Sequence, residues 1–387
     1  MINVFQPTTG DEELAAVSEV FASNWLGHGP RTKEFEERFA AHLGVDPGHV
    51  LFINSATSGL FLATELLGIG PGDEVVMPSA SFVAAGNAVA STGARLVFCD
   101  VDERTMNPTV AHIEQALTPD TTAVLILHYG GHPGDVAAIA RLCRERGIRL
   151  IEDAACAVAS KVDGVACGTF GDVAMWSFDA MKVLVTGDGG MLYVRDPELA
   201  LRAKRLAYHG LEQSSGFSAA RVSHRWWELN VKDFGRRIVG NDIAAAIGLV
   251  QLARLPEFVA RRRAIGDLYG QLLADVDGVV LPPEPPEGQT SSHYFYWVQL
   301  EPEIRDQVAA DLLEEGIYTT FRYPPLHKVP AYGSDHAELP GTEASSENTL
   351  LLPLHQGLDD EEVRKVAAVL RKSVEYRSAS ARSRRVR

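Results

Sequence analysis

From residue 50 onward, short apolar runs alternate with segments of helical periodicity, and this alternation most constrains the fold. The apolar runs read VLFIN, EVVMP, RLVFCDV, TAVLILHY and IRLIED, and between them lie stretches such as ATSGLFLATELLG and DVAAIARLCRERG. In those stretches apolar residues recur three and four positions apart, as on one face of a helix. Strands that alternate with helices build βαβ units, so we predict an α/β fold with a mostly parallel sheet flanked by helices. Polar residues at the strand ends should then meet at the carboxyl edge of that sheet.

The length of the chain, 387 residues, exceeds what one hydrophobic core usually covers, so we expect two domains. A large domain should span residues 1–240 and include N-terminal helices near 11–23 and 31–43, followed by a long linking helix over 241–274. After the Pro-rich stretch PPEPPEGQ, the aromatic run HYFYWVQL belongs to a smaller C-terminal α/β domain over 275–371. Residues 372–387 are rich in Ser and Arg without apolar periodicity, which predicts a disordered basic tail.

Composition excludes several classes of protein. The net charge of −15 argues against a nucleic-acid-binding surface over most of the body. No stretch approaches about 18 uninterrupted apolar residues, and the N-terminus lacks the basic and apolar regions of a secretory signal, so we expect no membrane span and no export. The cysteines lie apart, without metal-site spacing, and are expected to be reduced thiols of a cytoplasmic protein; they are Cys99, Cys143, Cys156 and Cys167.

Two polar residues of the sheet region suggest a cofactor. Asp153 ends the run IRLIED, and Lys182 lies in WSFDAMKVLVTGDGG. Alone, the aspartate fits a helix cap or a metal ligand equally well, and a lone lysine is usually a surface residue. Together they suit pyridoxal phosphate, which needs a lysine to hold its aldehyde as a Schiff base and a carboxylate to pair with its pyridinium nitrogen. Desolvation between Met181 and Val183 should lower the pKa of Lys182 and help it shuttle protons. Glu152 points to the other face of its strand and is expected to be structural.

Hydroxyl and aromatic side chains complete this constellation. The residues that follow VLFIN open a helix, whose free N–H groups and hydroxyls suit the cofactor phosphate, although a plain helix cap would look the same; they are Ser55, Ala56, Thr57 and Ser58. Ser177 is a second hydroxyl candidate. Phe82, at a strand-to-helix turn, could stack on the pyridine ring or belong to the core.

The order of eight motifs along the chain indicates a known family. The motifs are NWLGHGP, FINSATSG, GIGPGDEVVMPSASFVA, HYGGHPGD, IEDAACA, WSFDAMKVLVTGDGG, GIYTTFRYPPLHKVPAY and LLLPLHQGL. With them, from about Trp25 to about residue 371, the chain resembles the sugar-nucleotide aminotransferases of the DegT family, which are fold-type-I pyridoxal phosphate enzymes. The resemblance implies that Lys182 is the Schiff-base lysine and Asp153 the pyridinium partner. It also implies phosphate contacts and ring stacking from Thr57, Ser58, Ser177 and Phe82.

The chain departs from the family pattern at two places. Cys156 stands where the family usually has Gln or His near the phenolic oxygen of the cofactor, and a thiol is a weak hydrogen-bond partner. Arg237 aligns with an Asn that reaches the phosphate of the neighbouring subunit, with Asn241 as the alternative. An arginine can hold a phosphate bidentately.

The resemblance also implies a substrate site between two subunits of a homodimer. His28 and Gly29 match an early loop near the substrate, and Tyr323 and His327 are candidates for contact with the sugar or diphosphate. His327 alone is more often a structural histidine. Residues 293–295 belong either to the same rim or to the core of the small domain.

The expected activity is transfer of an amino group from L-glutamate to a nucleotide-linked keto-deoxysugar. TDP-4-keto-6-deoxyglucose, aminated at C4, is favoured slightly over C3 amination of a 3-keto sugar. A glutamine-dependent keto-cyclitol aminotransferase and a non-enzymatic sugar- or cofactor-sensing regulator on the same fold are the alternatives. Lys182 disfavours the branch that carries histidine there and removes a hydroxyl. The Arg- and Ala-rich composition indicates a GC-rich genome and favours an antibiotic-sugar pathway.

Overall fold

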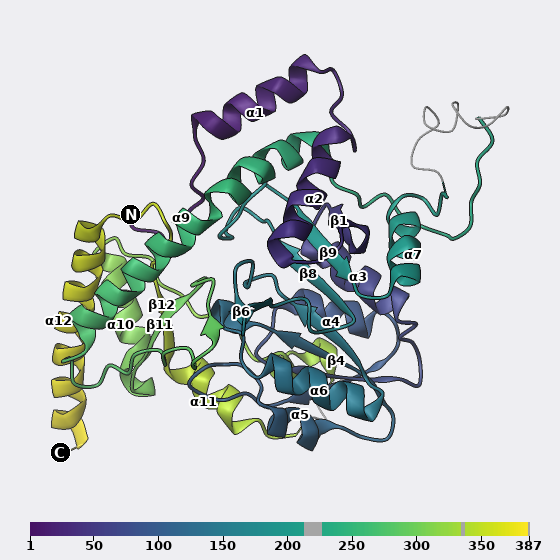
Figure 1. Ribbon diagram of the computed structural model, residues 1–387. Helices are drawn as coiled ribbons and strands as arrows, with labels where there is room; N and C mark the ends of the chain where they lie inside the picture. Colours follow the sequence, from purple (N-terminus) through teal and green to yellow (C-terminus); the bar gives the residue numbers. More distant parts are fainter. Residues whose placement is uncertain (213–226, 334–336, 386–387) are drawn as a thin grey trace.

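A central sheet of seven strands organises the larger part of the computed structural model, which describes residues 1–212, 227–333 and 337–385 (Figure 1). Its strand order is β1-β9-β8-β5-β4-β2-β3. The strands are β1 (Val50–Ile53), β2 (Glu74–Pro78), β3 (Arg95–Cys99), β4 (Thr121–Leu127), β5 (Arg149–Asp153), β8 (Val173–Ser177) and β9 (Gly190–Val194). All neighbours from β3 to β8 pair in parallel, and only β9 runs antiparallel to the strands beside it. The predicted mostly parallel α/β sheet is confirmed.

Helices bury both faces of this sheet because its strands are apolar on both sides. Alternate residues of one strand enter different cores: Leu51 and Ile53 face one hydrophobic cluster, and Val50 and Phe52 face the other. The first cluster is covered by α3 (Ala56–Leu66), α4 (Val83–Ala90) and α7 (Pro197–Ala207). The second is covered by α2 (Pro30–Leu43), α5 (Val110–Ala116), α6 (Val136–Arg146) and the start of α9 (Asp242–Leu273).

The small domain has its own core around a two-stranded antiparallel sheet, β11 (Tyr296–Gln299) and β12 (Thr349–Leu352). Its helices are α10 (Pro302–Glu314), α11 (Pro340–Asn348) and α12 (Asp360–Arg385). Helix α9 joins the two domains, since Leu249 packs in the large-domain core and Tyr269 in the small-domain core. In Figure 1 it runs as one long helix beneath α1 (Asp11–Ala22) toward α12.

The predicted domain boundaries need two corrections. Ile2 packs in the small-domain core and bridges to Ile317, so the first residues leave the large domain. Strand β10 (Gln289–Thr290) pairs with β6 (Lys161–Val162), which in turn pairs with β7 (Val165–Ala166), so this segment returns to the large domain before β11 begins.

The predicted disorder of the tail is also wrong for residues 372–385, because α12 continues to Arg385, and residues 386–387 lie outside the described residues. Two side chains of this segment bind Asp311 of α10. The Ser373 hydroxyl donates to its carboxylate at 2.5 Å, and Arg377 Nε donates at 2.9 Å. Val374 is fully buried beside them. Pairing with α10 therefore stabilises a helix that the local composition does not favour.

By length and composition, α9 is apolar enough to cross a membrane. It packs, however, against α1, α2 and α12 inside the molecule, and a core helix passes the same test. Gln251 of α9 is buried and donates to Glu13 of α1 at 2.7 Å. These contacts are those of a core helix.

Candidate active site

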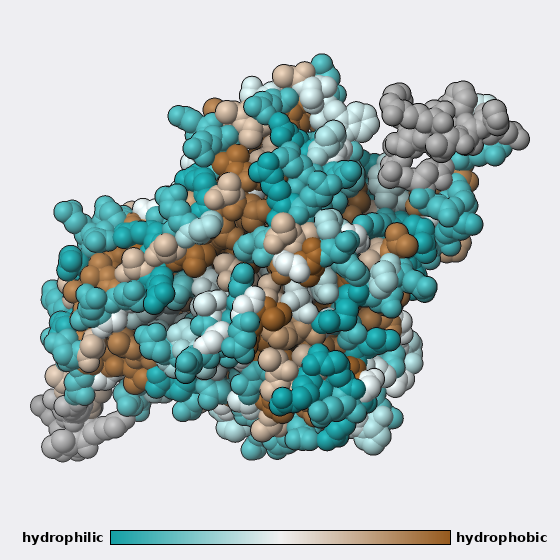
Figure 2. All heavy atoms as spheres, viewed as in Figure 1, coloured by the Kyte–Doolittle hydropathy of each residue, from teal (hydrophilic) through white to brown (hydrophobic). Residues whose placement is uncertain are grey.

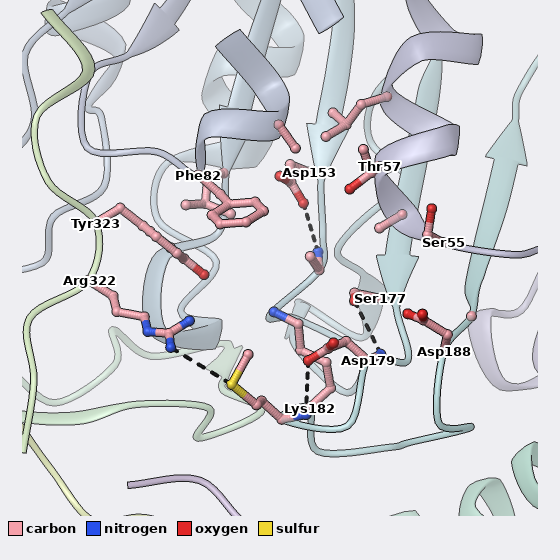
Figure 3. A pocket seen from close by; sticks show the side chains of 17 residues that line it. Ser55, Thr57, Phe82, Asp153, Ser177, Asp179, Lys182, Asp188, Arg322 and Tyr323 are labelled. Atoms are coloured by element: carbon pink, nitrogen blue, oxygen red, sulfur yellow. Dashed lines mark hydrogen bonds between the residues drawn. The ribbon is translucent and has the colours of Figure 1, made fainter. Parts of the chain in front are cut away.

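A cavity of about 270 Å³ opens at the carboxyl edge of the sheet, where β5, β8, α3 and α4 meet a loop of the small domain (Figure 3). Its wall unites residues that lie far apart in the sequence: Ser55, Ala56, Thr57, Leu60, Phe82, Ala84, Leu127, Asp153, Ala155, Ser177, Asp179, Met181, Lys182, Asp188, Gly189, Arg322 and Tyr323. Parallel strands deliver their last residues to one edge, so this convergence follows from the topology.

Asp153 is the last residue of β5, and its carboxylate is buried. One oxygen accepts a hydrogen bond from the Ala155 N–H at 3.0 Å. Burial raises the pKa of Asp153, while this N–H and the charge of Lys182 partly offset the increase. A buried carboxylate with so few donors suits a cationic partner, and a protonated pyridine nitrogen would supply one.

Lys182 lies in the loop after β8 and points into the cavity (Figure 3). Its Nζ lies 3.9 Å from Cys156 Sγ and 4.5 Å from the centre of the Tyr294 ring. The sequence predicted a lowered pKa for Lys182, but the net shift of this pKa is upward. Burial does lower the pKa of Lys182, but the negative charges that Cys156, Tyr294 and Asp153 can carry outweigh it and raise the pKa.

The start of α3 forms the opposite wall. Ser55 is its N-cap and accepts a hydrogen bond from the Ser58 N–H at 3.1 Å, which leaves Ala56 and Thr57 facing the cavity. A Cβ on Gly190 would lie 2.7 Å from Ala56 N, so glycine lets β9 pass close beneath this helix start. Ser177 lines the same end. Free N–H groups and hydroxyls gathered in this way suit a phosphate. Among the phosphate contacts predicted at the start of α3 and the end of β8, only Ser58 is not part of the wall.

Aromatic rings cover the other side. Phe82 is the N-cap of α4 and is 44% exposed, so its ring is a wall of the cavity and not part of the core. Its centroid lies 5.5 Å from that of Tyr323, a predicted substrate contact that also lines the cavity. Cys156 is buried behind them, with Sγ 3.8 Å from the Tyr323 hydroxyl. Tyr294 belongs to the buried core and reaches Lys182 from there.

Several predicted site residues lie away from this cavity within one chain. His28 lines a separate pocket together with Tyr208 and Lys204. The Arg237 guanidinium lies 5.4 Å from the centre of the Tyr208 ring. Asn241 caps α9 by accepting from the Ala244 N–H at 3.0 Å, so its side-chain oxygen is already used.

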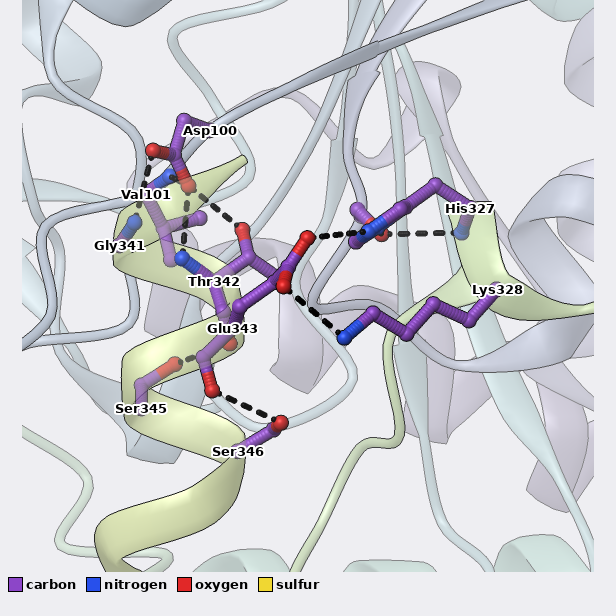
Figure 4. Close-up of polar contacts among 10 residues, drawn as sticks. Asp100, Val101, His327, Lys328, Gly341, Thr342, Glu343, Ser345 and Ser346 are labelled. Atoms are coloured by element: carbon purple, nitrogen blue, oxygen red, sulfur yellow. Dashed lines mark hydrogen bonds and ion pairs between the residues drawn. The ribbon is translucent and has the colours of Figure 1, made fainter. Parts of the chain in front are cut away.

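Gly29 and His327 are held by contacts within the protein. A Cβ on Gly29, the N-cap of α2, would lie 2.4 Å from the Trp25 ring. His327 Nδ1 lies 2.7 Å from the Ser79 hydroxyl. Its Nε2 lies 3.3 Å from the Glu343 carboxylate, as Figure 4 shows. Both ring nitrogens are engaged, which favours the structural role of His327.

The wall residues that sequence reasoning did not assign to the site include Asp179, Met181, Asp188 and Arg322. Three of them flank Lys182 in the chain, and their proximity to a proposed Schiff-base lysine was a usable signal. Arg322 comes from the small domain, and only its position next to Tyr323 pointed to the cavity.

Comparison with known proteins agrees with this geometry. Residues 7–371 match the model of the DegT/DnrJ/EryC1/StrS aminotransferase family. A dTDP-4-dehydro-2,3,6-trideoxy-D-glucose 4-aminotransferase of Saccharopolyspora spinosa is 65% identical over 97% of both chains. The aminotransferase TlmJ of Streptoalloteichus hindustanus superimposes with a TM-score of 0.93 at 60% identity, covering 97% of this chain and 99% of that one.

A Streptococcus pneumoniae relative has been solved in its PLP form, with a TM-score of 0.88 at 28% identity over 96% of this chain and 98% of that one. These likenesses extend over nearly the whole length of this chain, and they agree with the cavity that Lys182, Asp153 and the start of α3 form. The chain therefore belongs to the DegT/DnrJ/EryC1/StrS aminotransferase family, as a fold-type-I, pyridoxal-phosphate-dependent enzyme.

Proposed function

We propose that this enzyme transfers an amino group from L-glutamate to C4 of a TDP-linked 4-keto-deoxysugar. The observation that carries the proposal is the 65% identity, over 97% of both chains, to an enzyme described as a 4-aminotransferase of such a sugar. The cavity contains the groups that amine transfer requires, because Lys182 and Asp153 face the same space. The identity also favours C4 over C3 amination.

Different residues of the chain have different roles in the reaction. Pyridoxal phosphate, when bound, supplies an electron sink that stabilises a carbanion. The buried carboxylate of Asp153 would keep a proton on the ring nitrogen, and the start of α3 would hold the phosphate. Lys182 Nζ, released when the donor amine takes its place, accepts the proton from the donor Cα. In the second half-reaction the same nitrogen returns a proton to the sugar carbon that receives the amine.

We also propose a homodimer in which a second copy completes the phosphate site. Of the described residues that line the cavity, only Lys182 and Arg322 are cationic, and neither belongs to the wall at the start of α3. Asp179 and Asp188 add negative charge to the cavity. A phosphate there needs another cation, and Arg237 of a second copy is our candidate.

Exposed apolar side chains support such pairing. Figure 2 shows apolar surface along α9 beneath α1, among other apolar areas of this face. The exposed residues of this region and of the segment before α9 include Leu14, Phe21, Trp25, Leu229 and Phe234. Patches of this kind mark interfaces. We further propose that the enzyme works in the cytoplasm, in keeping with its unbridged buried cysteines, and in an antibiotic-sugar pathway.

The test is incubation of the purified enzyme with pyridoxal phosphate, nitrogen-15-labelled L-glutamate and a panel of ketones, followed by mass spectrometry of each product. The panel contains TDP-4-keto-6-deoxyglucose, its 2,3-dideoxy analogue, a TDP-3-keto-6-deoxysugar and a keto-inositol, and L-glutamine replaces glutamate in parallel. We expect label in the 4-keto sugars with release of 2-oxoglutarate. Label only in the 3-keto sugar, or only in the keto-inositol with glutamine, would refute the proposed substrate.

A further inference from the structure

Arg322 contributes a positive charge to the active-site cavity that the reaction described above does not use. Its backbone is held to the small-domain sheet, since Leu351 N donates to Thr320 O at 2.7 Å two residues earlier in the chain. The side chain crosses from there to the large domain. Figure 3 shows the guanidinium beside Tyr323, pointing into the cavity toward Lys182.

The described part of the chain gives this guanidinium no carboxylate partner. The guanidinium contacts Met181 Sδ at 3.8 Å and the ring of Phe5, whose centre lies 5.1 Å away. Its charge still reaches the reacting centre. Burial raises the pKa of Tyr294, and the charges of Lys182 and Arg322 partly offset that increase. A half-buried arginine with only a sulfur and a ring beside it can accept an anionic ligand bidentately.

The two substrates carry different anions, and these anions lie at different distances from the reacting atoms. The α-carboxylate of an amino-acid donor is bonded to the carbon that carries the amine, so its oxygens stay within about 4 Å of that nitrogen. The amine must replace Lys182 Nζ, on the side where Arg322 points. The diphosphate of a nucleotide sugar is separated from C4 by the width of the sugar ring, and it lies farther from the reacting atoms.

Charge elsewhere in the cavity directs a carboxylate to the same place. Asp153, Asp179 and Asp188 line the wall formed by β5 and by the segments around Lys182, and they would repel a donor carboxylate that turned toward them. Arg322 stands across the cavity on the small-domain side. Only one orientation of the donor then satisfies both its amine and its carboxylate.

We propose that Arg322 binds the α-carboxylate of the amino-acid donor and thereby sets donor specificity. This role rests on the proposed function, since it assumes an α-amino acid as donor. The anion leaves with the keto acid, and the uncharged sugar ring of the second substrate then occupies the same space. Arg322 therefore serves the first half-reaction much more than the second.

The test compares the two half-reactions in wild type, Arg322→Gln and Arg322→Lys, with Arg144→Gln on the exposed surface of α6 as the matched control. Stopped-flow spectra of the cofactor band report the reaction with L-glutamate, and product formation from the pre-aminated enzyme reports the reaction with the keto sugar. Binding is measured separately, by titration with 2-methyl-L-glutamate, which lacks the Cα proton, and by calorimetry with TDP.

We expect Arg322→Gln to lower the specificity constant for L-glutamate roughly 100-fold, because a charged hydrogen-bonded pair is lost. The binding of 2-methyl-L-glutamate should weaken for the same reason. TDP binding and the sugar half-reaction should stay within about threefold of wild type, and Arg322→Lys should recover part of the loss. The preference for L-glutamate over 4-aminobutyrate, which lacks only the α-carboxylate, should shrink in Arg322→Gln.

Three results would overturn this role: a selective loss of TDP binding or of the sugar half-reaction, an equal loss with L-glutamate and 4-aminobutyrate, or unchanged glutamate kinetics. The first would assign Arg322 to the diphosphate and the second to the distal carboxylate. None of them affects the proposed function, which fails if the wild-type enzyme does not aminate the 4-keto sugars of the panel.

Discussion

Glu152 and Asp153 are consecutive residues of β5, yet their carboxylates serve opposite faces of the sheet. Asp153 lines the active-site cavity. Glu152 is buried on the other face, where it accepts hydrogen bonds from the N–H groups of Gly168 at 2.7 Å and Gly171 at 2.6 Å and lies 3.0 Å from His128 Nε2. The two-residue period of a strand separates the two roles, and the expected structural role of Glu152 agrees with these contacts.

Replacing Glu152 with Ala should therefore destabilise the enzyme without altering its chemistry. Two buried N–H groups and a histidine would lose their acceptor, which costs about 3 kcal/mol or more. We expect a lower Tm by calorimetry and a normal cofactor spectrum in the folded fraction. Glu152→Gln, which keeps one acceptor oxygen, should lose less. A normal Tm for Glu152→Ala would show that this network contributes little.

Replacing Asp153 with Asn should have the opposite pattern. Burial raises the pKa of Asp153 in the cofactor-free protein, so its charged form is unfavourable there, and removing the charge should leave the Tm of the cofactor-free enzyme equal or higher. Activity should fall about 100-fold or more, because nothing then keeps the ring nitrogen protonated. Paired measurements of Tm and turnover check this. A large drop in Tm together with normal turnover would contradict both halves of the prediction.

Lys182→Ala should abolish the visible band of the lysine-bound cofactor and lower kcat by at least about 1,000-fold. Absorption spectra with added pyridoxal phosphate and single-turnover assays measure the two effects. Lys372→Ala, an exposed lysine of α12, is the control and should behave as wild type. If Lys182→Ala retains full turnover, the assignment of the lysine is wrong.

Glu36 on α2 should make stability fall as pH rises. Burial raises its pKa from 4.5 to about 7, and it accepts from the Phe52 N–H at 2.8 Å. Between these two values the folded state keeps a proton that the unfolded state has released, so increasing pH favours unfolding. The Tm of Glu36→Gln should exceed that of wild type by several degrees at about pH 8 and by little at about pH 5. Glu12→Gln, an exposed residue of α1, is the control, and a gap that does not change with pH would refute the assignment.

If Arg237 acts on the site of a second copy, two inactive variants should complement each other. Mixed dimers of Lys182→Ala and Arg237→Ala contain one site with both residues intact. After subunits are exchanged in an equal mixture, activity should recover to about a quarter of wild type, because half of the dimers are mixed and have one working site. Lys182→Ala mixed with itself controls for the exchange procedure. No recovery, with exchange verified, would show that Arg237 acts within its own chain or not at all.

Much of this enzyme could be predicted from its sequence. Apolar periodicity and strand-helix alternation are local properties, and they determined the parallel sheet, the long α9 and the position of Asp153 at a strand end. The order of motifs determined the family and its cofactor, and it led to the role predicted for Lys182. These features need only neighbouring residues and the rule that parallel strands end at one edge.

The rest depended on contacts between distant segments, which only the tertiary structure decided. The predicted disordered tail is the helical end of α12, because Ser373 and Arg377 find Asp311 on α10. The pKa of Lys182 is raised and not lowered, because folding brings Cys156 and Tyr294 beside it in addition to burying it. Arg322 faces the cavity for the same reason, since the small domain carries it there from a distant part of the chain. Charge and hydrogen bonding act over a few ångströms in space, and sequence distance does not reveal which groups come that close.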